Sequence, residues 1–98
     1  MNDGLTARLA DLAARHESTS YGALARDLGL RMGELTAALE ALMEEDAALG
    51  RPFRAVVVSA RGSALPARGF FDKAAELGRP AADQTAYVVA ERLALSQP

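Results

Sequence analysis

Residues 20–43 read Ser-Tyr-Gly-Ala-Leu-Ala-Arg-Asp-Leu-Gly-Leu-Arg-Met-Gly-Glu-Leu-Thr-Ala-Ala-Leu-Glu-Ala-Leu-Met, and this stretch decides the fold that the sequence predicts. Leucines recur at helical spacing on both sides of Gly29. Glycine enters the left-handed backbone region without steric penalty, so Gly29 is where the chain can turn. Ala25 is small enough for two helices to cross closely. The pattern therefore predicts two short helices joined by a tight turn, over about residues 20–49.

This arrangement resembles the helix-turn-helix family, in which the second helix usually lies in the DNA major groove. The leucine spacing also fits an ordinary helical hairpin in a small bundle, so that alternative stays open. What the resemblance implies is a module that binds nucleic acid, without naming a target sequence.

The rest of the chain extends this pattern in both directions. A first helix is expected over about residues 3–15, and three consecutive valines predict a strand over 54–59 because β-branched side chains pack well in extended chains. Residues 67–71 are expected either to return as a second strand or to lead directly into a short helix over 72–77. We expect one domain, 1–98, with the two helices and turn at about 20–49, a strand and wing at about 53–71 and C-terminal helices at about 71–95.

The predicted order of three helices, a strand, a glycine-bearing loop and a short return is that of a winged helix. The fold class expected is therefore mainly α with a small β-hairpin, a winged helix-turn-helix with an extra C-terminal helix. Residues 21–71 also resemble the DNA-binding half of the alkylguanine-DNA alkyltransferase and alkyltransferase-like families. There a Tyr-Gly-x-hydrophobic-Ala start precedes a helix-turn-helix, an extended Val-Val segment and a glycine-bearing turn. Those enzymes carry Pro-Cys-His-Arg before the Val-Val pair, where this chain has Pro52-Phe53-Arg54-Ala55. The resemblance thus implies the fold without alkyl transfer.

Composition narrows the function classes. The 98 residues contain no Cys and one His, which removes disulfides, thiolate metal sites and a cysteine nucleophile. No phosphate-binding, dinucleotide or paired-carboxylate motif is present, so we expect no enzyme, no cofactor and no metal. The sequence shows no leader pattern and no long apolar run, which predicts a cytoplasmic protein without a membrane partner.

The net charge of −2 is unevenly distributed. Residues 1–50 hold four Arg and nine acidic residues, a balance of −5, whereas residues 51–98 hold seven basic and four acidic residues, a balance of +3. A negative chain is unfavourable for binding nucleic acid, because phosphates are attracted by clustered Lys and Arg. Any electrostatic contact with DNA is therefore expected mainly after the predicted helix-turn-helix.

Five residues are candidates for nucleic-acid contact. Arg31 and Thr36 lie at the exposed start of the third predicted helix, where side chains approach base edges. Arg54, Arg61 and Arg68 flank or occupy the predicted wing, and arginine suits phosphate and minor-groove contacts. The alternative for these three is solubility together with pairing to the acidic first half. Of the adjacent phenylalanines at 70 and 71, one is expected to fill the core and the other to cover the junction between the wing and the last helix, with base stacking as the alternative.

Two further sets of residues are candidates for protein contacts. Glu44, Glu45 and Asp46 lie near the end of the third predicted helix and form either a solvated face paired with Arg51 or Arg54, or an acidic contact for a basic partner. In the last helix the inward stripe is expected at positions 82, 86, 89, 90 and 93. Tyr87 and Val88 then add apolar surface that a homodimer through the terminal helices, the first helix, or both would cover.

Two functions follow from these patterns. The first is a small non-enzymatic winged-helix module that binds duplex DNA, as in transcription regulation. The second is a protein–protein adaptor that keeps the same fold and binds its partner through the acidic third helix or the C-terminal helix.

Overall fold

The computed structural model describes residues 3–97, and the side chains of residues 4–97. The chain forms α1 (Asp3–Ala14), β1 (Thr19–Ser20), α2 (Tyr21–Leu28), α3 (Met32–Ala48), the 3-10 helix η1 (Arg54–Val57), β2 (Val58–Ser59), α4 (Arg68–Glu76) and α5 (Gln84–Ser96). The predicted class, mainly α, is confirmed. None of the described helices is long and apolar enough to cross a bilayer.

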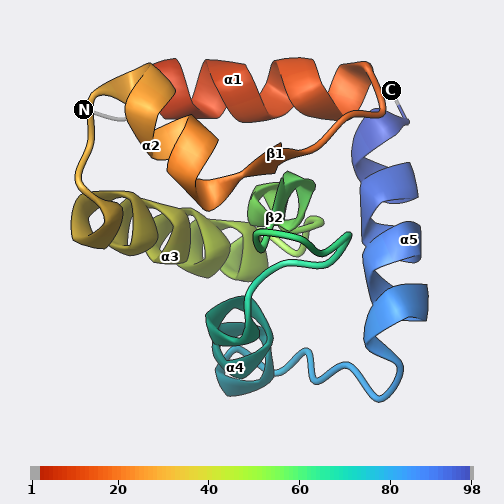
Figure 1. Ribbon diagram of the computed structural model, residues 1–98. Coiled ribbons are helices and arrows are strands. Elements are labelled where there is room, and N and C mark those ends of the chain that lie inside the picture. Colours follow the sequence, from red (N-terminus) through yellow and green to blue (C-terminus); the bar gives the residue numbers. More distant parts are fainter. Residues whose placement is uncertain (1–2, 98) are drawn as a thin grey trace.

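The short segment η1–β2 lies in the middle of the molecule, and the helices pack around it (Figure 1). η1 contacts α1, α3 and α5, and α4 packs against α3. Phe53, Val56, Val57 and Val58 are at most 1% exposed. They face leucines of the surrounding helices, Leu5, Leu9, Leu24 and Leu35 among them, in one hydrophobic core.

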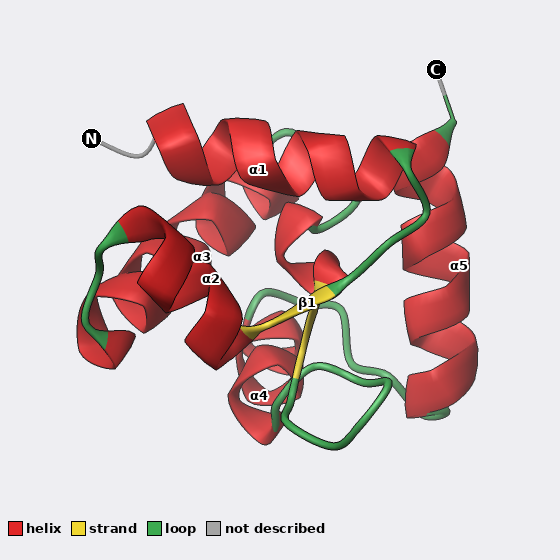
Figure 2. Ribbon diagram, turned by 45° about the horizontal axis from the view of Figure 1, so that its top comes forward, coloured by secondary structure: helices red, strands yellow, loops and turns green. Residues whose placement is uncertain are grey.

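The predicted β-hairpin is wrong in the described residues. β2 pairs in parallel with β1, Thr19 opposite Val58 and Ser20 opposite Ser59, instead of with a returning strand (Figure 2). Residues 54–57 form a 3-10 helix instead of a strand. Of the two alternatives for residues 67–71, the structure supports the direct lead into a helix, because α4 begins at Arg68. Of the three valines, Val56 and Val57 lie in the 3-10 helix and Val58 in β2, and all three are buried in a space enclosed by helices.

Side chains from the helices supply the hydrogen bonds that a neighbouring strand would otherwise make to this segment. Glu91 of α5 accepts from the Phe53 N–H at 2.9 Å, and Arg92 of α5 donates to the Val56 carbonyl at 3.0 Å. From α3, the Asp46 carboxylate accepts from the Arg54 N–H at 2.9 Å. Because buried backbone groups need partners, these three residues allow the non-strand conformation at the centre of the fold.

The same contacts reverse the face of α5 that the sequence predicts. Val88 is buried, and Glu91 and Arg92 point inward with it, whereas Val89 and Leu93 are 54% and 52% exposed. Hydrophobic periodicity assigned Val89 and Leu93 to the core and gave no role to Glu91 or Arg92. The orientation of α5 is set instead by the hydrogen bonds that Glu91 and Arg92 make to the backbone of Phe53 and Val56.

Candidate nucleic-acid interface

The turn between α2 and α3 has the geometry that the sequence predicts. Gly29 has φ 68° and ψ 31°, in the left-handed region, and the Leu30 N–H donates to the Ala25 carbonyl at 2.9 Å. α2 begins at Tyr21 because Ser20 caps it, its hydroxyl accepting from the Ala23 N–H at 3.1 Å. Leu24 and Ala25 of α2 are buried, so the two helices are held firmly against the core.

The start of α3 is exposed on one side and anchored on the other. Leu35 and Leu39 are buried, while Met32 is 50% exposed and Thr36 is exposed beside it. The Glu34 carboxylate accepts from the Arg31 N–H at 2.8 Å, which satisfies a donor at the helix start and turns this acid back onto its own backbone. Arg31 itself is exposed.

Three arginines near these helix starts have no carboxylate within ion-pairing distance among the described side chains: Arg26, Arg31 and Arg61. Arg26 lies on α2 and Arg31 immediately before α3. Arg61 lies in the loop of residues 60–67, which is closed by a hydrogen bond from the Ala60 N–H to the Leu65 carbonyl at 2.8 Å. The three side chains come from three different segments and are all exposed.

Two adjoining hollows bring these segments together. One, of about 380 Å³, is mainly apolar and lies between α3 and the loop, with Met32, Thr36, Met43 and Phe70 in its wall. The other, of about 550 Å³, lies at the start of α2 and has both Arg26 and Arg61 in its wall. Met32, Tyr21 and Arg61 line both hollows. We call the surface formed by Arg26, Arg31, Met32, Thr36 and Arg61 the arginine face.

Tyr21 fixes the loop against α2. Its hydroxyl oxygen accepts a hydrogen bond from the Ala67 N–H at 3.1 Å, which ties the end of the loop to the first residue of α2. Burial raises the pKa of Tyr21, so the phenol stays protonated at neutral pH. The position of Arg61 relative to Arg26 is thus set by a contact between distant parts of the chain.

The structure places the five candidates for nucleic-acid contact in different parts of the molecule. Arg31, Thr36 and Arg61 lie together on the arginine face. Arg54 lies in the interior, 18% exposed at its side chain and bound to Asp46 at 3.0 Å, so its predicted DNA contact is wrong. Arg68 is 93% exposed on α4 and makes only a 3.9 Å contact with Asp72, and its DNA contact stays a prediction.

Both phenylalanines at 70 and 71 pack in the core, at 5% and 9% exposure. Phe70 makes edge-to-face contacts with Phe53, at 5.9 Å between ring centroids, and with Phe71, at 5.2 Å. The packing alternative is therefore confirmed for both residues, and base stacking by either ring would require a change of fold.

The acidic end of α3 is neutralised within the chain. Glu44 pairs with Lys73 at 2.7 Å, and Glu45 pairs with Arg51 at 2.9 Å. Asp46 is fully buried and binds both Arg51, at 2.6 Å, and Arg54. A partner cannot reach Asp46, which corrects that part of the partner-binding prediction, while contact through Glu44 or Glu45 stays a prediction.

Of the α5 candidates, Val88 is 1% exposed and belongs to the core, so it cannot contribute to the predicted dimer surface. Tyr87 is partly buried, and burial, with the neighbouring Glu91 carboxylate, raises its pKa to about 12. The two residues cover η1 and the segment before it. Any contact between copies through α5 would use Val89 and Leu93.

Arg26 is the arginine of the arginine face that sequence analysis missed. In sequence it has Asp27 beside it and looks like one half of a solvated pair. In the structure Asp27 faces Arg8 of α1 instead, at 3.8 Å. Adjacent residues point about 100° apart around a helix, so the helical period already indicates that Arg26 and Asp27 face different directions.

The described residues contain no group of three or more His, Cys, Asp or Glu that could hold a metal ion. Comparisons of the chain with protein-family models, with curated protein sequences and with solved structures found no match.

Proposed function

We propose that this protein is a non-enzymatic helix-turn-helix module that binds duplex DNA through the arginine face. The observation that carries the proposal is the set of three exposed arginines, Arg26, Arg31 and Arg61, that have no carboxylate partner among the described side chains and lie around α2 and the start of α3. Unpaired arginines retain their full charge for phosphates, and helix starts add partial positive charge and free N–H groups.

In this proposal α3 is the recognition helix. Thr36 and Arg31 approach base edges, and Arg26 and Arg61 contact phosphates on either side. The loop of residues 60–67 takes the place of the wing. The Glu34 carboxylate is held at the start of α3 by the Arg31 N–H.

The three acidic residues at the C-terminal end of α3 do not oppose this proposal strongly. Glu44, Glu45 and Asp46 have cationic partners within the chain and lie at the opposite end of the helix from Arg31. The repulsion that they exert on phosphates is reduced by those partners and by distance.

The likeness to alkyltransferase-like proteins is part of the same proposal and concerns binding alone. With no Cys in the chain, no residue is available to accept an alkyl group in their manner. Phe53, which stands where those enzymes have the nucleophile, is fully buried against Phe70 and under the Arg79 guanidinium, 4.3 Å from the ring centroid.

Fluorescence anisotropy with a random duplex at 50 and 200 mM salt tests the proposal. Two phosphate contacts predict a salt slope of about −1.8 and hence a loss of affinity of about 12-fold between the two conditions. The double variant Arg26→Ala/Arg61→Ala should flatten the slope by about two units.

The matched control is Arg15→Ala, because Arg15 is also exposed but lies at the end of α1 and pairs with Asp11 at 3.2 Å. It should leave both affinity and slope unchanged. Absence of DNA affinity in the wild-type protein at 50 mM salt would reject the proposal and favour the adaptor function.

A further inference from the structure

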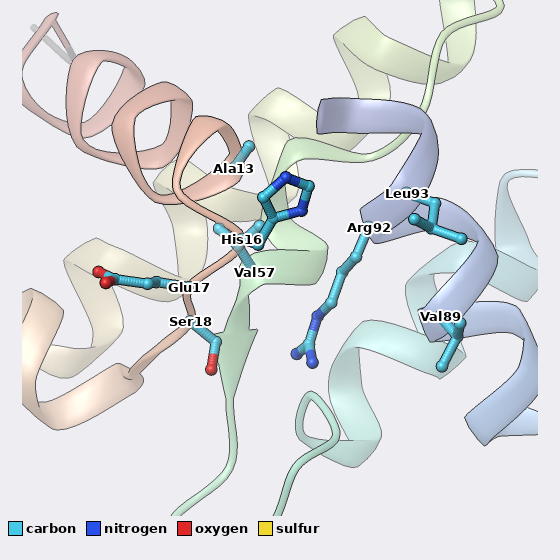
Figure 3. A pocket seen from close by; sticks show the side chains of 8 residues that line it. All are labelled: Ala13, His16, Glu17, Ser18, Val57, Val89, Arg92 and Leu93. Atoms are coloured by element: carbon cyan, nitrogen blue, oxygen red, sulfur yellow. The ribbon is translucent and has the colours of Figure 1, made fainter. Parts of the chain in front are cut away.

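A second pocket lies where the end of α1 meets α5 (Figure 3). Its volume is about 240 Å³. Ala13, Val57, Val89 and Leu93 give it apolar walls, and Arg92, His16 and Ser18 add polar groups. None of these residues belongs to the proposed DNA surface.

Arg92 carries a partly buried charge that the described side chains do not compensate. Its guanidinium donates to the Val56 carbonyl at 3.0 Å and to the Ser59 hydroxyl at 3.0 Å, and no described carboxylate lies within ion-pairing distance. Burial lowers the pKa of Arg92, which reflects the same missing counter-charge. By contrast, the similarly sheltered Arg54, Lys73 and Arg79 all face carboxylates.

The guanidinium has donors left for a ligand. Arginine carries five N–H groups, and the two bonds within the chain use two of them. In Figure 3 the side chain extends from α5 with its guanidinium on the side of Ser18, and the Glu17 carboxylate points away from it. An anion reaching this end of the pocket would meet a cation and a hydroxyl with no opposing charge in front of it.

The other walls favour an apolar group. Val89 and Leu93, one turn apart on α5, are among the most exposed large apolar side chains of the described residues, at 54% and 52%. Ala13 and Val57 form the inner wall beside them, and both are buried. A ligand body seated here would cover apolar surface that the chain itself leaves in water.

The connection that closes the pocket is held in an unusual backbone conformation. His16 has φ 58°, and the Glu17 N–H donates to the Leu12 carbonyl at 2.9 Å to end α1. A residue other than glycine in the left-handed region is uncommon and carries strain. Here it turns the chain sharply enough to bring the His16 ring and Ser18 to the wall opposite α5 (Figure 3).

We propose that this pocket binds a small monocarboxylate with an apolar ring or chain. The carboxylate accepts hydrogen bonds from the free N–H groups of Arg92 and from the Ser18 hydroxyl, and the apolar body lies against Val57, Val89 and Leu93. The volume of the pocket limits the ligand to one smaller than a typical drug. Binding supplies the counter-charge that Arg92 lacks.

Phenylacetate and its neutral analogue phenylacetamide are suitable probes, because they differ in charge and little in shape. Titration of the full chain, followed by ¹H–¹⁵N chemical shifts, should move the amide signals of Ser18, Val89 and Leu93 and leave those of Arg26 and Arg31 in place. Phenylacetamide should bind at least about tenfold more weakly, since charge-assisted hydrogen bonds to arginine are the ones lost.

Val89→Glu keeps the fold, because the side chain is exposed, and places a negative charge at the pocket wall. It should weaken phenylacetate binding at least about tenfold, a change of about 1.4 kcal/mol. Leu49→Glu is the matched control, since Leu49 is an equally exposed apolar residue, 63%, at the end of α3.

Three results would each overturn the proposal: no binding of phenylacetate up to about 10 mM, equal binding of the amide, or unchanged binding by Val89→Glu with its thermal unfolding intact. DNA affinity is measured separately, so failure here leaves the proposed function standing, and the reverse also holds.

Discussion

The two ends of α3 use charge in different ways. At the C-terminal end of α3, a cation from residues 51–73 binds each of Glu44, Glu45 and Asp46, and Asp46 is fully buried. At its start, Arg31 and its neighbours Arg26 and Arg61 have no carboxylate partner among the described side chains. Charges at the end hold the fold together, and charges at the start remain available to a partner.

Replacing Asp46 tests the structural end of this comparison most severely. Asp46→Asn removes the nearer and buried counter-charge of Arg54, a side chain only 18% exposed, and weakens the bonds to Arg51. Removing one partner of a buried ion pair typically lowers the free energy of unfolding by about 3–5 kcal/mol. Urea unfolding followed by circular dichroism measures this loss, and a change below about 1 kcal/mol would show that Asp46 is not the anchor of residues 51–54.

The same residue shows how far sequence reasoning reaches. Local signals predicted α2, Gly29 and the start of α3 correctly, because a cap, a left-handed glycine and a leucine period all act within a few residues. They also suggested Arg51 and Arg54 as partners for the acids. They did not show that Asp46 is buried, because that depends on the central segment lying across the end of α3.

The arginine face could likewise be predicted only in part, because local signals do not show which distant segments come together. Arg31, Thr36 and Arg61 could be chosen by residue type and position, but Arg54 was chosen on the assumption of an exposed wing. Once residues 54–57 form a buried 3-10 helix, that arginine turns to Asp46. In α5 the apolar period pointed to Val89 and Leu93, and no local rule reveals that Glu91 and Arg92 are needed inside.

Alkaline titration tests the support that α5 gives to the segment after α3. Burial, followed by the Glu91 carboxylate, raises the pKa of Tyr87 to about 12 from its ordinary 10.0. Between these values the folded protein keeps a proton that the unfolded chain releases, so this stabilisation is complete below pH 10 and is lost as pH rises to 12.

Over that interval wild-type stability should fall by roughly 1–2 kcal/mol more than that of Tyr87→Phe. Unfolding in urea at pH 9.5 and at pH 11.5 measures the difference, and titration of other groups is common to both proteins. Parallel loss in the two proteins would mean that Tyr87 is open to water in the folded state.

Two glycines at the start of α3 provide a matched pair. A Cβ at Gly29 would meet no neighbour within 4 Å, but its φ of 68° strains any other residue, so Gly29→Ala should lower the free energy of unfolding by about 1 kcal/mol. Gly33 lies within α3 with the same open space and no positive φ, so Gly33→Ala should raise it by about 0.5–1 kcal/mol. Opposite signs are the result expected from thermal unfolding, and equal signs would contradict the left-handed turn.

The smallest change in stability is expected at Glu44. This variant also tests most directly whether the two ends of α3 differ in function. Its side chain is 58% exposed, and Lys73 keeps a second acid, Glu76, at 3.4 Å. Glu44→Gln should therefore change stability by less than about 1 kcal/mol, as for other exposed pairs. Its effect on DNA affinity should be equally small, because this end of α3 lies away from the arginine face. A large gain in DNA affinity from Glu44→Gln would instead mean that the end of α3 also faces the phosphates, and that the two ends are not separate in function.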